Sequence, residues 1–312
     1  MFEILGLVLI FIAGVFVGSF LNVVSDRVPA HESPLKGRSR CPHCNAKLAP
    51  LDLIPLLSYL LLRGKCRYCG KKISLYYPAS EILTGVAFLA IAYYLNVFTQ
   101  TNALVWFNFA YLATLASFLI VLFLTDIKYK LIPNRIVMPA IIFVLFFMIA
   151  SFAFIAISSY TQMKADPFGQ YLLQVGYWQS QMFYLLRSLL ITIFSALVLA
   201  GFFKLLIWAT KGKGMGGGDV KLAFLVGLVN GFPLNVVAVV LAFVSGAAFS
   251  GILMLMRRKG LRDVIPFGPF LILGSVVAFI FGQQIFNWYL TPHLIPLFDV
   301  SRRYLQAACY RL

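Results

Sequence analysis

The sequence predicts an all-α polytopic membrane protein, with about eight transmembrane helices and a small cytosolic zinc-binding loop domain. The chain is 61% hydrophobic and only 12% charged, whereas a soluble domain is about half apolar and a quarter charged. Several apolar runs exceed the roughly 18 residues that indicate a membrane-spanning helix. The third observation is that four of the five cysteines form two Cys-x-x-Cys pairs inside one basic stretch.

The basic charge is concentrated in short polar segments. The formal net charge of +16 raises the possibility of a nucleic-acid-binding protein. However, ten of the 26 lysines and arginines lie between Arg27 and Lys72, and most others fall in short loops between apolar runs. This is the positive-inside pattern of membrane proteins. We therefore expect anionic membrane lipids as electrostatic partners, and no nucleic acid.

The apolar runs define the expected spans in chain order. Residues 4–24 form the first; no basic segment precedes it and no A-x-A-like site follows, so we interpret it as a retained span and not a cleaved signal peptide. The other spans are expected at about 79–97, 103–125, 132–157, 183–210, 219–230, 234–256 and 265–290. The predicted domains are 1–24 (first transmembrane helix), 25–78 (four-cysteine domain), 79–290 (transmembrane peptidase domain) and 291–312 (interfacial tail).

The loop charges predict an orientation. With the N-terminus outside, most basic residues fall on one side, in the loops at 25–78, 126–132, 211–218 and 257–264. This side is then the cytosol. The mixed, aromatic segment 158–182 is expected to be an outside loop, with or without a surface helix. Asp126 and Asp219 both come at the cytosolic ends of their spans.

The two cysteine pairs predict a structural metal site. Cys41 and Cys44 are separated from Cys66 and Cys69 by 21 residues, slightly more than in a typical zinc ribbon. Four thiolates form a closed tetrahedral zinc site with no open position for chemistry. A loop with one short apolar run needs such a staple to fold. Reduced or redox-active thiols are the alternative.

Three acidic residues lie within spans or at their ends: Glu81, Asp126 and Asp219. Two carboxylates that meet in a partly dry site share a proton, so one can activate water while the other protonates a leaving amine. Gly216, Gly217 and Gly218 precede Asp219 and let backbone approach a substrate closely. The plainer alternatives are a helix cap at Asp219 and an ion pair between Asp126 and Lys128.

The ordered motifs of the chain resemble those of bacterial type IV prepilin peptidases, which are intramembrane aspartyl proteases with a G-x-G-D sequence. The matching motifs are Gly18-Ser19-Phe20-Leu21-Asn22, the cysteine pairs, Tyr77-Pro78-Ala79-Ser80-Glu81, Asp126 followed by Ile132-Pro133-Asn134, Gly216-Gly217-Gly218-Asp219, and Pro266-Phe267-Gly268-Pro269-Phe270. The resemblance implies that Asp126 and Asp219 are the catalytic pair. It also implies cleavage of the basic leaders of prepilins or pseudopilins, at the cytosolic face of the inner membrane.

The resemblance extends to a second activity. The cysteine loop resembles that of the members that methylate the new N-terminal amine with S-adenosylmethionine, and peptidase-only relatives lack it. Glu81 matches a glutamate of the family pattern, which suggests a role near the methylation site; a pair with a basic loop residue is the plainer interpretation. No G-x-G-x-x-G motif follows a predicted strand, so no Rossmann-type donor site is visible.

Two other classes remain as alternatives. In a transporter, Asp126 and Asp219 would bind protons or cations at a broken helix. Against this, both aspartates come at one edge of their spans and no internal repeat is obvious. In a zinc-loop scaffold, changes to the cysteines would destroy function and changes to the aspartates would not.

Overall fold

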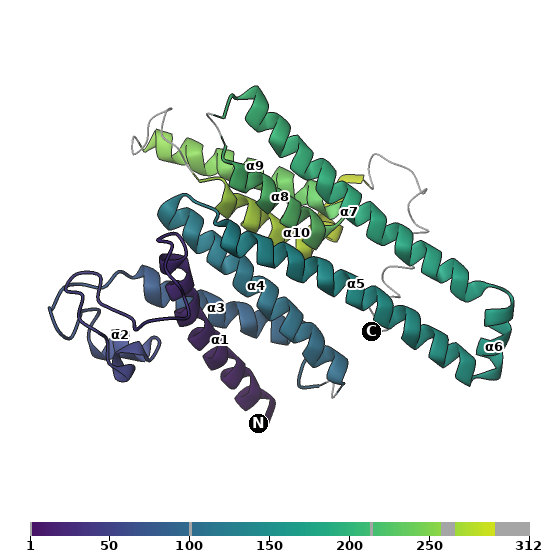
Figure 1. Ribbon diagram of the computed structural model, residues 1–312, viewed down its shortest axis with the longest axis horizontal. Coiled ribbons are helices and arrows are strands. Elements are labelled where there is room, and N and C mark those ends of the chain that lie inside the picture. The colour runs from purple at the N-terminus through teal and green to yellow at the C-terminus, as the bar shows by residue number, and fades with distance from the viewer. Residues whose placement is uncertain (1, 100–101, 213–214, 257–265, 291–312) are drawn as a thin grey trace. The chain divides into compact units, whose positions relative to one another are not determined.

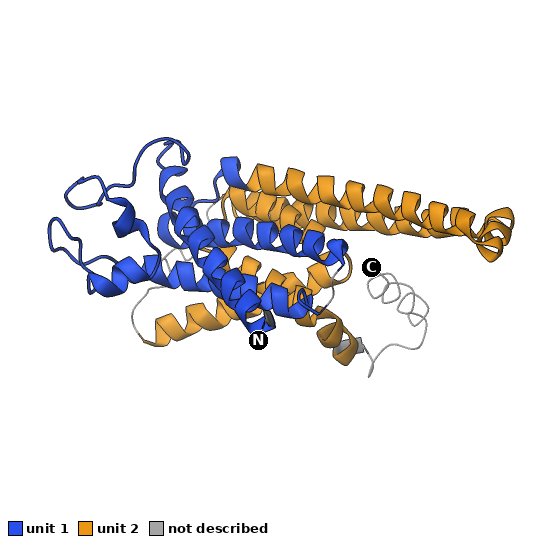
Figure 2. Ribbon diagram, turned by 90° about the horizontal axis from the view of Figure 1, so that it is seen from below, with its two compact units in different colours: residues 1–136 blue, residues 137–312 orange. Residues whose placement is uncertain are grey.

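The chain folds into two compact units, unit 1 with residues 1–136 and unit 2 with residues 137–312 (Figure 2). The computed structural model describes residues 2–99, 102–212, 215–256 and 266–290. Within these ranges the named elements are all helices, and extended pairing is limited to two isolated bridges. The predicted all-α membrane class is therefore confirmed.

Unit 1 is built on three long helices, α1 (Phe2–Arg27), α3 (Tyr76–Tyr94) and α4 (Ala103–Tyr129) (Figure 1). Helices α1 and α3 run antiparallel and touch through glycines. A Cβ on Gly14 would lie 2.8 Å from the Cα of Gly85, and one on Gly18 would lie 2.9 Å from the Cα of Glu81. Small residues allow this close backbone approach, which is how membrane helices commonly associate.

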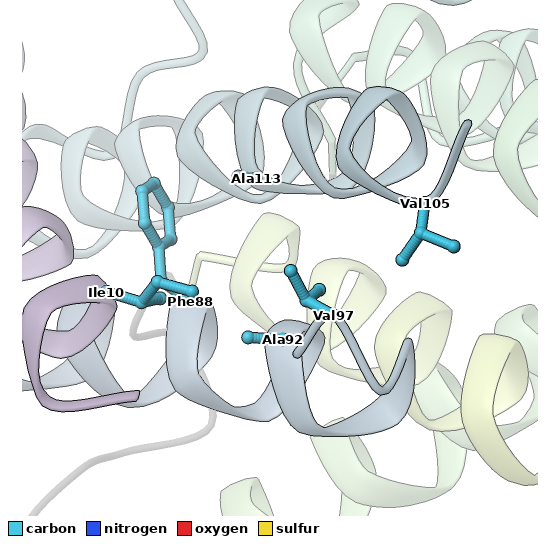
Figure 3. Close-up of a cluster of buried hydrophobic side chains, with 6 residues drawn as sticks. All are labelled: Ile10, Phe88, Ala92, Val97, Val105 and Ala113. Carbon is cyan, nitrogen blue, oxygen red and sulfur yellow. The ribbon is translucent and has the colours of Figure 1, made fainter. Parts of the chain in front are cut away.

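An apolar cluster packs α1, α3 and α4 together on the side of unit 1 that contains the turn between α3 and α4 (Figure 3). Its buried members are Ile10, Phe88, Ala92, Val97, Val105 and Ala113. They come from α1, α3, α4 and the turn between α3 and α4. Packing at this end leaves the opposite end of unit 1, where α1 and α4 both finish, for polar residues.

The segment between α1 and α3 has little regular structure. It contains a short 3-10 helix, η1 (Pro50–Leu53), and a five-residue helix, α2 (Leu57–Leu61). The isolated bridges Arg40–Lys47 and Lys65–Lys72 each enclose one Cys-x-x-Cys pair. The one short apolar run of the loop thus contains a short helix, α2.

In unit 2, one helix of 14 residues packs against three longer helices. Its helices are α5 (Asn134–Ala165), α6 (Pro167–Gln174), α7 (Tyr177–Ala209), α8 (Gly217–Asn230), α9 (Leu234–Leu255) and α10 (Gly268–Leu290). Helix α8 packs against α7, α9 and α10, and Leu222 and Leu225 on it are fully buried. A Cβ on Gly227 would lie 2.6 Å from the Cα of Ala196, so α7 and α8 are in close contact.

The predicted count of eight spans is not confirmed. Among the described residues, six helices are long and apolar enough to cross a membrane: α1, α4, α5, α7, α9 and α10. Helix α3 has 19 residues, with polar and aromatic residues near both ends. Helix α8 has 14 residues, a rise of about 21 Å against about 30 Å of hydrocarbon.

The segment 158–182 is more regular than an outside loop. Helix α5 continues to Ala165, α6 follows, and α7 begins at Tyr177, so the anticipated surface helix is α6. Trp178 ties the two long helices together, because its indole N–H donates to the carbonyl of Ala156 at 3.3 Å. The predicted tail at 291–312 and basic loop at 257–264 lie outside the described residues.

Candidate functional site

The four paired cysteines come together in unit 1. Their sulfur atoms all lie within 4.8 Å of one another, and the Sγ atoms of Cys41 and Cys69 are 4.0 Å apart. Cys41 and Cys66 are buried, with 3% and 5% exposure. The structure thus groups all four predicted ligands.

Each cysteine pair is held by the same backbone turn. The N–H of Cys41 donates to Ala46 and the carbonyl of Cys41 accepts from Asn45, both at 3.0 Å. The N–H of Cys66 donates to Lys71 and its carbonyl accepts from Gly70, both at 2.9 Å. Asn45 and Gly70 both have positive φ, +56° and +69°, a conformation that Asn and Gly tolerate best. The loop is therefore two copies of one knuckle.

Two thiols of the cluster, Cys41 and Cys69, have pKa values shifted in opposite directions. Burial raises the pKa of the Cys41 thiol, but hydrogen bonds from the backbone N–H groups of His43 and Cys44 outweigh burial and lower the pKa to about 7. A backbone hydrogen bond from Lys71 lowers the pKa of Cys69, but burial and hydrogen bonds with the other sulfurs raise it to about 11. Of these two thiols, Cys41 therefore ionises at the lower pH.

The cluster fits a zinc ion. Tetrahedral coordination at a Zn–S distance of about 2.3 Å places the sulfurs about 3.8 Å apart. The observed 4.0 Å between two of them, and the limit of 4.8 Å for all, require only a small contraction. An ion held by four thiolates would have no open position, so it would stabilise the fold of the loop and would take no part in hydrolysis.

Asp126 lies in the last turn of α4 and is buried, with 5% exposure. The backbone ends the helix there, because the N–H of Lys130, in the left-handed conformation, donates to the Asp126 carbonyl at 2.9 Å. Next to it, the hydroxyl of Tyr76 donates to the carbonyl of Leu124 at 3.2 Å. The carboxylate is therefore carried by a helix end that α3 holds in place.

Asp219 lies in the first turn of α8 and is half-buried. Its Oδ2 accepts a hydrogen bond of 3.1 Å from the N–H of Gly216, so the expected capping role is present. A Cβ built on Gly217 would meet no described atom within 4 Å, and Gly216 has an ordinary extended φ of −91°. Neither packing nor backbone strain among the described residues explains why Gly216 and Gly217 are glycines.

The two aspartates lie in different units, Asp126 in unit 1 and Asp219 in unit 2. Their meeting in one site therefore stays a prediction. Lys128, which the sequence suggested as an ion-pair partner of Asp126, forms its ion pair with Asp26 at 2.6 Å.

Glu81 lies in the second turn of α3 and is 8% exposed. Its Oε2 accepts a hydrogen bond of 2.9 Å from the backbone N–H of Leu56. Glu81 thus contacts the cysteine loop, as the plainer interpretation anticipated, but through a backbone group instead of a basic side chain.

A polar cluster at the end of α4 was not predicted. The Lys128 ammonium lies 5.2–5.3 Å from the ring centroids of Tyr76, Tyr77 and Tyr129. Asp26 accepts hydrogen bonds from the hydroxyls of Tyr77 and Tyr129 at 3.0 and 3.1 Å. The cluster ties α4, two residues beyond Asp126, to α1 and α3. Asp26 and Lys128 are 102 positions apart, and no local sequence signal links them.

The Pro266–Phe270 motif lines a cleft of about 260 Å³ in unit 2, together with residues of α9. Phe243 and Phe267, which line the cleft, pack with Phe203, and the three ring centroids are 5.0–6.2 Å apart. The motif therefore borders a cleft at the start of α10, and neither Asp126 nor Asp219 lines this cleft.

Two sequence families match the chain. The bacterial peptidase A24 N-terminal domain matches residues 12–95, and the type IV leader peptidase family matches residues 113–251. The first match contains the cysteine loop and Glu81, and the second contains both aspartates. No solved structure is significantly similar.

Relatives of nearly the same length carry the name prepilin leader peptidase/N-methyltransferase. One from Bacillus subtilis (strain 168) is 32% identical over 283 residues, which are 90% of this chain and 97% of the relative. One from Aeromonas hydrophila is 32% identical over 319 residues, with 92% and 94% covered. One from Pseudomonas aeruginosa is 27% identical over 300 residues, with 89% and 91% covered.

Proposed function

This chain belongs to the type IV leader peptidase family, and on that premise we propose that it cleaves the leader peptides of prepilins or pseudopilins with Asp126 and Asp219 as a catalytic pair. We further propose that it methylates the N-terminal amine that cleavage exposes. The single observation that carries the first proposal is the setting of Asp219, which follows glycines that the fold of the described residues does not require.

The proposed chemistry needs only the two carboxylates and one water. A shared proton leaves one aspartate ionised and the other protonated. The ionised member takes a proton from the water as its oxygen attacks the scissile carbonyl carbon, and the protonated member donates to the carbonyl oxygen. When the C–N bond breaks, the leaving amine takes the proton that the first carboxylate gained, and the second carboxylate takes a proton from a hydroxyl of the tetrahedral intermediate, so the pair returns to its starting state. No metal takes part in this step.

The glycines supply access for an extended peptide. A side chain at Gly217 would project into space that the described residues leave open, and one at Gly216 would meet only Asp219 and Gly218, at 4.0 Å. A substrate strand would approach the backbone there. Asp219, half-buried at the start of α8, lies at the end of this open stretch. We place the site at the cytosolic face of the inner membrane, where the basic leader would meet anionic headgroups.

The methylation proposal comes from the relatives' name, and S-adenosylmethionine supplies the methyl group when it is bound. A sulfonium cation suits an aromatic cage, but the cage of Tyr76, Tyr77 and Tyr129 is filled by the Lys128 ammonium. The residues present there do not fit the donor, so no residue is assigned to it.

The test is cleavage of a purified prepilin by full-length protein in lipid nanodiscs. Asp126→Asn and Asp219→Asn should each lower the cleavage rate by about 1,000-fold or more, because general acid–base catalysis is lost while the shape is kept. Asp166→Asn, at the cap of α6, is the matched control and should cleave normally. Full cleavage by either active-site variant would overturn the proposal. Mass measurement of the first residue of a cleaved pilin, with and without S-adenosylmethionine, tests methylation.

A further inference from the structure

The cysteine loop presents an apolar face that its own fold leaves uncovered. Leu57, Leu60 and Leu61 of α2 are 50%, 71% and 73% exposed. Their spacing at i, i+3 and i+4 places them on one side of the helix. Leu51 and Leu53 of η1 add exposures of 65% and 41%. Five exposed leucines in one short stretch are too many for a water-facing loop.

The opposite side of α2 is fixed by polar contacts, so the leucines are held in place. The N–H of Leu56, which has a positive φ of +57°, donates to Glu81 at 2.9 Å. The hydroxyl of Tyr59 donates to the carbonyl of Ile73 at 3.3 Å. A side chain on Gly64 would run into Tyr59. Helix α2 therefore cannot simply turn its leucines inward.

The contact with Glu81 fixes the depth of α2 relative to α1. Glu81 is level with Gly18, where α1 and α3 touch. Gly18 lies nine residues before Arg27, the end of α1, a rise of about 13 Å. The 25-residue apolar part of α1 rises about 37 Å, against about 30 Å of hydrocarbon. With α1 centred along the membrane normal, about 4 Å of the helix extends beyond the apolar layer at each end, which places the start of α2 about 10 Å inside that layer.

The stretch of chain that follows this apolar face is basic. Exposed basic residues follow α2 directly in the chain: Arg63, Lys65, Arg67, Lys71 and Lys72. The ion pair of Arg67 with Asp52, at 2.9 Å, neutralises one of them. Leucines on one side and several uncompensated cations beyond them are the pattern of a helix that lies in an anionic membrane interface.

We propose that η1 and α2 form an interfacial anchor, with the leucine face in the acyl region of an anionic bilayer, and that Glu81 holds the anchor at this depth. The partner is lipid, and not the substrate or a second copy of the chain. Glu81 is then a positioning residue for the loop. The proposal rests on the membrane spans and goes beyond the proposed cleavage, so either can fail without the other.

The test uses the full chain in nanodiscs of phosphatidylcholine and phosphatidylglycerol, with the photoreactive residue benzoylphenylalanine at one position at a time. Leu60 and Leu61 are the test positions. Lys36 is the control, because its carbonyl accepts a 2.9 Å hydrogen bond from Arg27 at the aqueous end of α1. Lipid adducts, identified by mass, should be several-fold more abundant at Leu60 and Leu61 than at Lys36. Equal lipid yields, or adducts at Leu60 to a second chain or to added prepilin, would overturn the proposal.

Variants of Glu81 test the anchoring role. Glu81→Gln keeps an acceptor for the Leu56 N–H, so the lipid yield at Leu60 should stay near that of the parent chain. Glu81→Ala removes the acceptor, so the yield should fall several-fold while bound zinc is retained. If Glu81→Ala left the yield unchanged, Glu81 would not set the depth of α2. Prepilin cleavage, followed in the same samples, reports separately on the catalytic pair.

Discussion

Units 1 and 2 each contribute one aspartate, but they hold it differently. Asp126 of unit 1 is buried at the end of a 27-residue helix, and side chains of α1 and α3 hold that end. Asp219 of unit 2 is half-buried at the start of a 14-residue helix, and its carboxylate accepts a hydrogen bond from the backbone N–H of Gly216 in the same turn. Packing therefore positions the first carboxylate, whereas local backbone geometry positions the second.

This difference teaches where each unit tolerates change. In unit 1 the aspartate is held by residues that are distant in the sequence, so substitutions at those residues should change the position of its carboxylate. In unit 2 the aspartate is held by the glycine stretch next to it, so substitutions in that stretch should change its position without altering the fold.

Loss of a cysteine should have the largest effect, and only on unit 1. Cys66→Ser should remove essentially all of the one zinc ion expected per chain, because three thiolates bind zinc far less tightly than four. Hydrogen exchange should then show loss of protection across both knuckles, with unit 2 unchanged. Cys309→Ser, outside the described residues, is the control and should keep its zinc. A zinc-free parent chain with protected knuckles would contradict a structural metal.

Substitution of each aspartate by glutamate should lower the cleavage rate more at the buried Asp126 than at the half-buried Asp219. Asp126→Glu should lower the cleavage rate by about 100-fold, because a buried site cannot absorb a methylene without moving the carboxylate by about 1 Å. Asp219→Glu should cost nearer tenfold, since its neighbourhood is open on the glycine side. The measurement is initial cleavage rate at saturating prepilin. Equal losses would mean that burial does not distinguish the two residues.

Two glycines of α8 should respond in opposite ways. Gly217→Ala should lower cleavage about tenfold, the effect of one added methyl in a binding site, with unfolding temperature nearly unchanged. Gly227→Ala should lower the free energy of unfolding by about 1–3 kcal/mol, because the new Cβ meets Ala196. Thermal unfolding in detergent and cleavage rates separate the two. If Gly217→Ala destabilised the protein as much, packing would explain both glycines.

The cluster around Lys128 should give the smallest effect. Lys128→Met should reduce cleavage by about fivefold at most, because the pair with Asp26 is about one-third exposed and such pairs contribute up to about 1 kcal/mol. Lys128→Arg should restore most of the rate. A double-mutant cycle with Asp26→Asn should show that the two losses are not additive. Additive losses would mean that the pair does not position the end of α4.

The sequence predicted the features that depend on residues close together in the chain. The predicted span 103–125 corresponds to α4, and the predicted helix start near Asp219 corresponds to α8 at Gly217. The four cysteines were predicted as one cluster because thiolate spacing is a local signal. The repeated knuckle was not seen, since it consists of backbone hydrogen bonds that different side chains share.

What the sequence could not predict depends on tertiary contacts or on length. Asp26 and Lys128 meet across 102 positions. The segment 158–182 was interpreted as a loop because of Lys164, Asp166 and Trp178, but the helices continue past the expected membrane boundary. Helices α5 and α7, with 32 and 33 residues, rise about 48 and 50 Å and are longer than a bilayer needs.

The shortness of α8 has a consequence for how water reaches a bond inside lipid. Its rise is about 9 Å less than the hydrocarbon thickness, so at least one end of it must open below the headgroups. The other end of α8, at Asn230, is packed against α10, because Asn230 is buried and its side-chain amide donates to the Ser275 hydroxyl at 2.7 Å. We therefore expect water to enter the membrane locally at Asp219. The scissile peptide bond of a substrate could then be hydrated there, while the adjoining transmembrane helix of the substrate stays in the hydrocarbon layer.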